Sequence, residues 1–139
     1  MTCLGLSRRI ANIVVYGHLA LFAYAIFVML EGPYDKNDTI QMMLMGSPIL
    51  SMTGLSAYKF ISGLNPADQS PLADPTWVQM STTVTSLFIV ALLVVYSMAI
   101  FDSNVSMNTL KIIVGAIETT LGGYLGITRD VLFPEAKGK

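Results

Sequence analysis

The chain has 139 residues, of which 53% are hydrophobic and 12% charged, with a formal net charge of −1 and a mean hydropathy of +0.62. Soluble domains carry about 25% charged residues, so this composition excludes an ordinary soluble domain and indicates an integral membrane protein. The near-neutral charge also argues against a nucleic-acid partner, which would require a basic surface.

Four windows with no charge, or with a single acid, follow one another at 10–30, 39–58, 76–101 and 112–128. About 20 helical residues, each rising about 1.5 Å, cross a hydrocarbon core of about 30 Å. We therefore expect an all-α polytopic membrane protein, a single helical domain over 1–139 with four transmembrane helices. The expected spans are about 10–30, 39–61, 76–101 and 110–129.

The first window follows a basic Ser-Arg-Arg sequence at 7–9, as a secretory signal would. Its apolar run is too long for a signal-peptide core and no small-residue cleavage site ends it, so we expect a retained helix. The Glu31-Gly32-Pro33 sequence predicts the end of this helix, because proline lacks the N–H group that would continue it.

His18, the single histidine of the chain, lies inside this first window. One interpretation is a packed, hydrogen-bonded side chain. The other is a pair with Glu118 that holds or relays a proton. A haem held by two histidines would require a dimer, and we expect no cofactor.

The second window contains Gly46, Pro48 and Gly54, so it is either a kinked span or a re-entrant segment. Gly46 and Gly54 are expected at helix contacts, where small residues allow close approach. A cluster of methionines in this window has the ligand chemistry of a soft copper site, but ordinary apolar methionines are far commoner, and no metal is expected. The cluster consists of Met42, Met43, Met45 and Met52.

The third window changes character along its length, since its first half is rich in hydroxyl groups and its second half is almost purely aliphatic. The favoured interpretation is helix packing, with the hydroxyls bonded back to their own helix; the alternative is a hydrated mouth. The polar residues are Gln79, Ser81, Thr82, Thr83, Thr85 and Ser86.

The fourth window carries Glu118 near its middle, where an ionised side chain costs on the order of 3 kcal/mol. At helical spacing Glu118 shares a stripe with small residues, namely Gly115, Thr119, Gly122 and Gly126. Such a stripe favours close helix association, so the acid is expected to face protein or a polar cavity. It is either a functional, pore-lining group together with Thr119 and His18, or a neutral tether between helices.

The cations fall mainly on one side of a four-span topology. Because cytoplasmic segments are enriched in lysine and arginine, we expect a protein of the cell inner membrane with both termini in the cytoplasm. One side holds Arg8, Arg9, Lys59, Arg129, Lys137 and Lys139, whereas the other holds Lys36 and Lys111.

No hydrolase spacing, phosphate-binding loop or paired thiol is present, and Cys3 is the single cysteine, so we expect no enzyme and no catalytic residue.

The layout resembles that of phage holins: a very small chain, nearly all membrane spans, with a short basic tail Glu-Ala-Lys-Gly-Lys at 135–139. The resemblance implies a homo-oligomer in contact with membrane lipids that forms a pore. The alternative is an accessory subunit of a larger respiratory, transport or secretion complex, docked through its last helix; an enzyme of membrane lipids is a weaker third.

Overall fold

The computed structural model describes residues 1–32, 35–62, 72–101 and 104–132 of the chain. Its helices are α1 (Cys3–Glu31), α2 (Lys36–Ser62), α3 (Pro75–Phe101) and α4 (Met107–Leu132). Within them, the side chains at 53, 54, 56–62, 100 and 129–132 lie outside the description. The expectation of an all-α fold is confirmed.

Each helix begins where a short polar side chain can accept hydrogen bonds from free backbone N–H groups. The Thr2 hydroxyl accepts from Gly5 N at 3.1 Å, and the Asp74 carboxylate accepts from Trp77 N at 3.0 Å. Ser106 caps α4 in the same way. The helix α1 ends at Glu31, where the sequence predicted its end, with Gly32 N bonded to the Val28 carbonyl.

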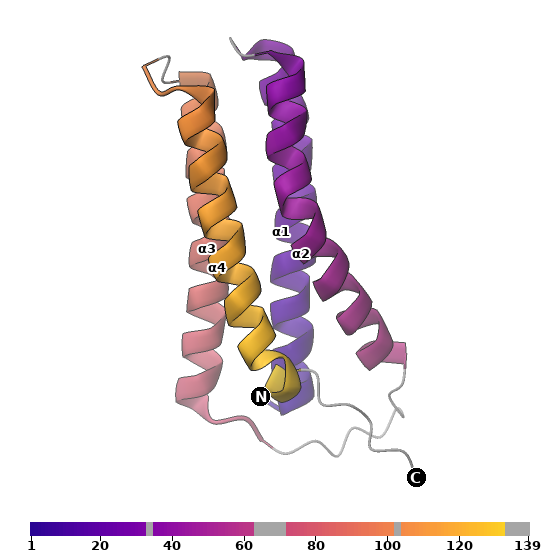
Figure 1. Cartoon of the computed structure of the whole chain (residues 1–139). Coiled ribbons are helices and arrows are strands. Elements are labelled where there is room, and N and C mark those ends of the chain that lie inside the picture. The colour runs from indigo at the N-terminus through magenta and orange to yellow at the C-terminus, as the bar shows by residue number, and fades with distance from the viewer. Residues whose placement is uncertain (33–34, 63–71, 102–103, 133–139) are drawn as a thin grey trace.

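The four helices form an antiparallel bundle that runs up, down, up and down (Figure 1). We call the end that holds the N-terminus and the last turns of α4 the terminal end, and the opposite end, where α1 leads to α2 and α3 to α4, the connection end. The helix α1 packs beside α2 and α3, and α4 packs beside the same two helices. The helices α1 and α4 are therefore diagonal to each other across the bundle.

The buried core consists of two apolar clusters, one toward each end of the bundle. The cluster at the connection end is the larger and draws on all four helices; it includes Leu21, Val28, Met42, Leu92, Val95 and Leu110. The cluster at the terminal end contains Leu6, Ile10, Val14 and Ala73. Polar residues lie between these clusters, and they include the candidate site.

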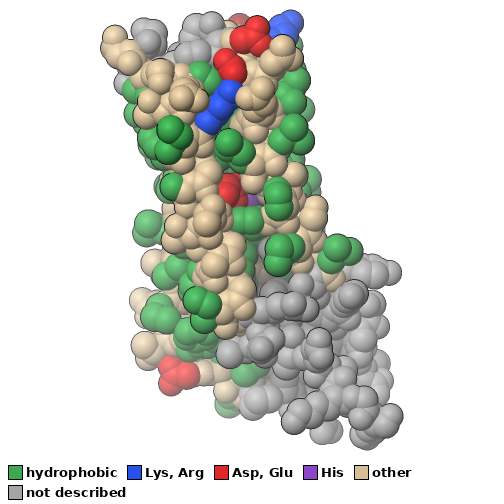
Figure 2. All heavy atoms as spheres, in the orientation of Figure 1, with side chains coloured by type: hydrophobic (Ala, Val, Ile, Leu, Met, Phe, Trp, Pro, Cys, Tyr) green, Lys and Arg blue, Asp and Glu red, His purple; other side chains and the backbone are tan. Residues whose placement is uncertain are grey.

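Three of the described helices are long and apolar enough to cross a membrane, over Cys3–Glu31, Pro75–Ala99 and Met107–Thr128. Large hydrophobic side chains such as Tyr16, Leu30 and Leu87 point outward, and Figure 2 shows hydrophobic side chains spread over the sides of the bundle. This pattern suits a surface in contact with lipid and supports a membrane protein. The helix α2 is continuous through Pro48 but is less apolar and is not among these three.

Candidate functional site

The bundle brings together the two ionisable residues that the sequence singled out. His18 of α1 and Glu118 of α4 face each other across the diagonal, with His18 Nε2 at 3.4 Å from both carboxylate oxygens. Both residues are buried, with exposed fractions of 1% and 5%. In Figure 2 red and purple side chains meet at mid-height of the bundle, far from the charged groups at its ends.

The other nitrogen of the His18 ring determines how the pair is protonated. Nδ1 lies 2.8 Å from the Val14 carbonyl oxygen, and because that oxygen only accepts, Nδ1 must carry a proton and donate it. Nε2 then faces the Glu118 carboxyl group, and the two attract each other when one proton lies between them. The geometry suits a pair that shares one proton and has no net charge, either as imidazolium and carboxylate or as imidazole and carboxylic acid.

Gly46 of α2 completes this site by providing room for the carboxylate. It is buried, and a Cβ atom at this position would lie 2.7 Å from Glu118 Oε1 and 3.4 Å from His18 Cδ2. Contacts below 3.0 Å are not tolerated, so any larger residue at position 46 displaces the carboxylate. The sequence suggested Gly46 as a packing position between helices, and the structure places it against the acid itself.

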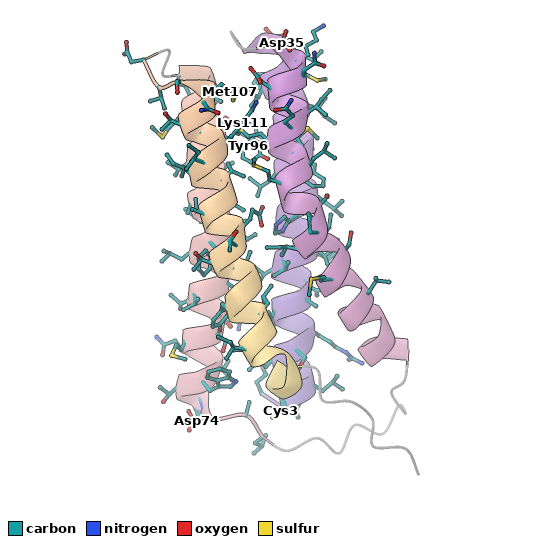
Figure 3. The ribbon with its side chains drawn as sticks, in the orientation of Figure 1. Cys3, Asp35, Asp74, Tyr96, Met107 and Lys111 are labelled. Carbon is teal, nitrogen blue, oxygen red and sulfur yellow. The ribbon has the colours of Figure 1, made fainter. Side chains whose placement is uncertain are left out.

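A second polar contact joins the other diagonal of the bundle, between α3 and α2. The buried Tyr96 hydroxyl donates to the Met42 carbonyl oxygen at 3.2 Å, one helical turn from Gly46 toward the connection end. Figure 3 shows Tyr96 pointing into the space between the helix pairs, close to the level of Lys111. Together with the larger apolar cluster, this contact closes the bundle on that side of the pair.

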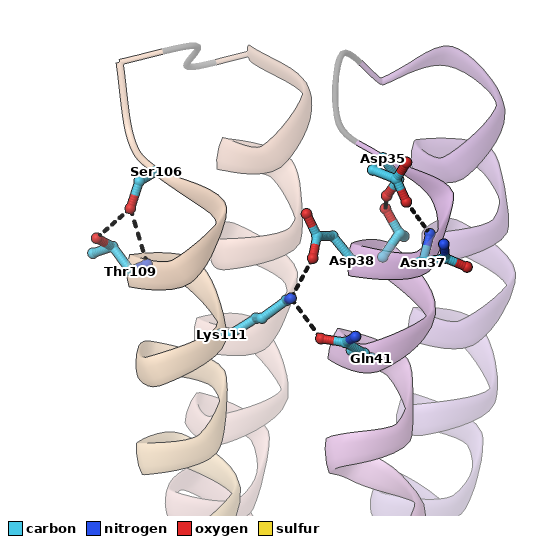
Figure 4. Close-up of polar contacts among 8 residues, drawn as sticks. Asp35, Asn37, Asp38, Gln41, Ser106, Thr109 and Lys111 are labelled. Atoms are coloured by element: carbon cyan, nitrogen blue, oxygen red, sulfur yellow. Dashed lines mark hydrogen bonds and ion pairs between the residues drawn. The ribbon is translucent and has the colours of Figure 1, made fainter.

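At the connection end, the side chain of Lys111 links α4 to α2. Its ammonium group donates to the Asp38 carboxylate and, at 2.6 Å, to Gln41 Oε1 (Figure 4). The sequence placed Lys111 among the cations on the side opposite the termini but indicated no partner for it. Asp38 and Gln41 are three residues apart and so lie on one face of α2. This spacing could have suggested that both bind the same cation.

The glycines of α4 divide between two environments. A Cβ at Gly122 would lie 3.1 Å from Ile49 Cδ1 of α2, and one at Gly115 would lie 4.0 Å from Met45 Sδ, so both face α2 within the same chain. Among the described residues, Gly123 and Gly126 have no atom within 4 Å of such a Cβ. Gly126 and the exposed Thr119 therefore lie on the outer side of α4, and the surroundings of Gly54 lie outside the described side chains.

The hydroxyl groups in the first half of α3 are not bonded back to their own helix. In the described part of the chain, Ser81 Oγ, Thr82 Oγ1 and Thr85 Oγ1 are buried without a hydrogen-bond partner, as is the Tyr124 hydroxyl of α4. Ser97, in the second half of α3, does bond back, donating to the Leu93 carbonyl at 2.8 Å. The packing interpretation of these residues therefore lacks the hydrogen bonds on which it rested.

Comparison of the chain with protein-family models, with curated proteins and with solved structures finds no match. Among the described residues, no group of three or more His, Cys, Asp or Glu side chains is placed to hold a metal ion. The chemistry of the site is thus that of a buried acid and histidine sharing a proton within a bundle of apolar helices.

Proposed function

We propose that the chain is a small pore-forming membrane protein, similar to holins, whose bundle is the closed subunit of a homo-oligomer. The observation that carries the proposal is the His18–Glu118 pair at mid-bundle, whose acid lies beside Gly46 in the seam between α2 and α4. Ionisable groups at this depth are unfavourable in lipid and generally serve a function. In an assembled pore, a glutamate from each subunit forms a negative ring that favours cations.

The seam between α2 and α4 has the properties of a gate. Gly46, Gly115 and Gly122 line it, so α4 and α2 each contribute positions without a side chain there, and Lys111 links the two helices at the connection end. Movement of α2 away from α4 uncovers Glu118, whose side chain is 7% exposed in the closed bundle. A closed subunit with a paired acid and an open one with a free acid are then two arrangements of the same bundle.

Assembly in this proposal uses the outer face of α4. Gly123 and Gly126 are uncovered there, next to the exposed Ala116 and Thr120. Small residues let helix backbones approach closely in lipid, where no hydrophobic effect drives association. The pore further requires that α2 cross the membrane as a fourth span, which places both termini in the cytoplasm according to the distribution of cations.

Reconstitution of the purified chain into liposomes tests this function. We expect a homo-oligomer in mild detergent and in cross-linking, together with ion flux through the liposome membrane. A monomer that conducts no ions contradicts pore formation. That outcome favours the accessory subunit, in which the outer face of α4 docks on a larger complex instead of on a second copy.

A further inference from the structure

Buried polar atoms without partners gather in one half of the bundle. In the part of the chain that the structure describes, they are Trp77 Nε1 and the hydroxyls of Ser81, Thr82, Thr85 and Tyr124. All of them lie on the first half of α3 or the last half of α4, which both belong to the terminal end. Ser81 and Thr85 are fully buried, so bulk solvent at the outer surface does not satisfy them.

These atoms lie at successive depths below the His18–Glu118 pair. Gly17 packs against Ile89, and Tyr24 bonds Ser97, so α1 and α3 run in the same direction. His18 therefore lies at the same depth in the bundle as the helical turn of α3 around Val90. At about 1.5 Å per residue, Thr85 lies about 7 Å from that level, Ser81 about 13 Å and Trp77 about 20 Å. Tyr124, six residues after Glu118 on α4, lies about 9 Å from it. The polar atoms therefore extend from the terminal end almost to the pair.

A groove at the terminal end meets this line of polar atoms. It has a volume of about 430 Å³ and lies between the first turns of α1 and α3. Arg9, Gln79, Thr82 and Thr83 contribute its polar lining, and the Thr82 hydroxyl is itself one of the buried atoms without a partner. The groove is therefore a partly polar opening that reaches the Thr82 hydroxyl.

The connection end of the bundle is different. Among the described residues, its buried polar side chains have partners: Tyr24 bonds Ser97 at 3.2 Å, and Tyr96 donates to the Met42 carbonyl. Apolar side chains of the larger cluster fill the space between them. Polar groups that can bind water thus extend inward from the terminal end, whereas the apolar cluster at the connection end offers water no polar partner.

From this asymmetry we propose that water enters the bundle from the terminal end and reaches the His18–Glu118 pair, which exchanges protons with that side of the membrane alone. A hydronium ion at the end of the route gives its proton to the pair, which then holds two protons and gains one positive charge; the reverse step returns a proton to water. Among the described residues, the titratable groups on the helices around the pair are Tyr24 on α1, Tyr96 on α3 and Tyr124 on α4, and α2 presents Gly46 there. The inference holds whether or not the chain assembles into a pore.

The single histidine makes water access directly measurable. The chain is labelled with ¹⁵N in histidine only, placed in lipid nanodiscs and transferred to D₂O, and exchange of the ring N–H protons of His18 is followed by NMR. We expect rapid exchange without unfolding in the wild type. The double variant Ser81→Ala, Thr85→Val should slow exchange by about tenfold or more, because water is unfavourable beside apolar walls. The control Ser97→Ala removes a hydroxyl from the other half and should leave the rate unchanged.

Thiol labelling in liposomes tests which end admits water. In a Cys3→Ala background, a small cationic thiosulfonate should modify Ser81→Cys and Thr85→Cys but not Ala25→Cys or Ala99→Cys, which lie in the larger apolar cluster. Labelling at all four positions overturns the one-sided route. Exchange of His18 that requires unfolding, or an equal rate in the double variant and the wild type, overturns the water route itself.

Discussion

Gly46 and Glu118 approach each other so closely that a single added carbon on the glycine would lie 2.7 Å from the carboxylate. The acid is therefore held between a histidine of α1 and the bare backbone of α2. A charge that would be unfavourable in lipid is neutralised by sharing one proton with His18, and the glycine leaves the space that this arrangement needs. The helices α1, α2 and α4 therefore all contribute to the position of Glu118 at mid-bundle.

The first prediction follows from this contact. Gly46→Ala should push the flexible carboxylate away from His18 without moving the backbone, and leave both groups poorly paired. Unpaired buried polar groups cost about 1–3 kcal/mol, offset in part by about 1 kcal/mol from the better helix propensity of alanine. Thermal unfolding in nanodiscs should show a lower midpoint for Gly46→Ala than for the wild type.

Gly126→Ala is the matched control for that experiment. It brings the same gain in helix propensity at a position where no atom lies within 4 Å of the new Cβ. Its midpoint should equal or exceed that of the wild type. If both alanine variants melt alike, the close approach of Gly46 to the acid has no energetic consequence.

A second prediction concerns the contact at the connection end. Lys111→Met keeps the length of the side chain but removes its bonds to Asp38 and Gln41, so α2 should separate from α4 more readily. Because the Asp38 side chain is 39% exposed, we expect a loss of stability of about 0.5 kcal/mol, decreasing at high salt. Lys36→Met, at an exposed position of the same charge, should change the unfolding midpoint less.

The sequence predicted the helices well because each feature it used is local. Apolar windows and the Glu31-Gly32 turn act over a few neighbours, so they indicated where the helices lie and where α1 ends. They did not indicate the start of α1, which is Cys3 rather than a residue near 10. His18 and Glu118 could be suggested as a pair because they are ionisable residues in the middle of apolar windows. Their alignment at the same depth follows from bundle packing, which sequence spacing does not specify.

Contacts across the bundle could not be predicted in the same way. The stripe on α4 was expected to act as one surface, but Gly122 faces Ile49 of its own chain whereas Gly126 faces outward. A crossing angle between α2 and α4 decides this division, and the angle depends on how whole side-chain layers fit. The role of Gly46 and the unbonded hydroxyls of α3 depend on the same packing.

The third prediction concerns membrane topology. If both termini lie in the cytoplasm, the connections near Asn37 and Asn104 lie outside. In a Cys3→Ala background, Asn37→Cys and Asn104→Cys should react with an impermeant thiol reagent in intact cells. Ser70 lies outside the described residues, in a connection that this topology places in the cytoplasm. Ser70→Cys should therefore stay unlabelled until the membrane is permeabilised. The inverse pattern would reverse the proposed orientation.

The fourth prediction concerns the outer face of α4. Gly126→Leu should keep neighbouring subunits apart and lower the oligomeric fraction in mild detergent, because dispersion contacts require close approach of the backbones. Ala20→Leu places the same side chain on the exposed face of α1 and serves as the control. Equal oligomer populations for the two variants would remove α4 as the assembly surface.

The last prediction separates the charge of Glu118 from its bonding. In Glu118→Gln the amide can donate to Nε2 of His18, so the pair keeps a hydrogen bond and the bundle should remain folded. Glu118→Leu leaves Nε2 buried without a partner and should destabilise the chain by about 1–3 kcal/mol. If the acid also forms a charged ring in the pore, the Gln variant should conduct but lose cation preference, measured as reversal potential in a salt gradient. Selectivity that is unchanged in a conducting Gln variant rules out the ring and leaves Glu118 as a proton-holding tether between α1 and α4.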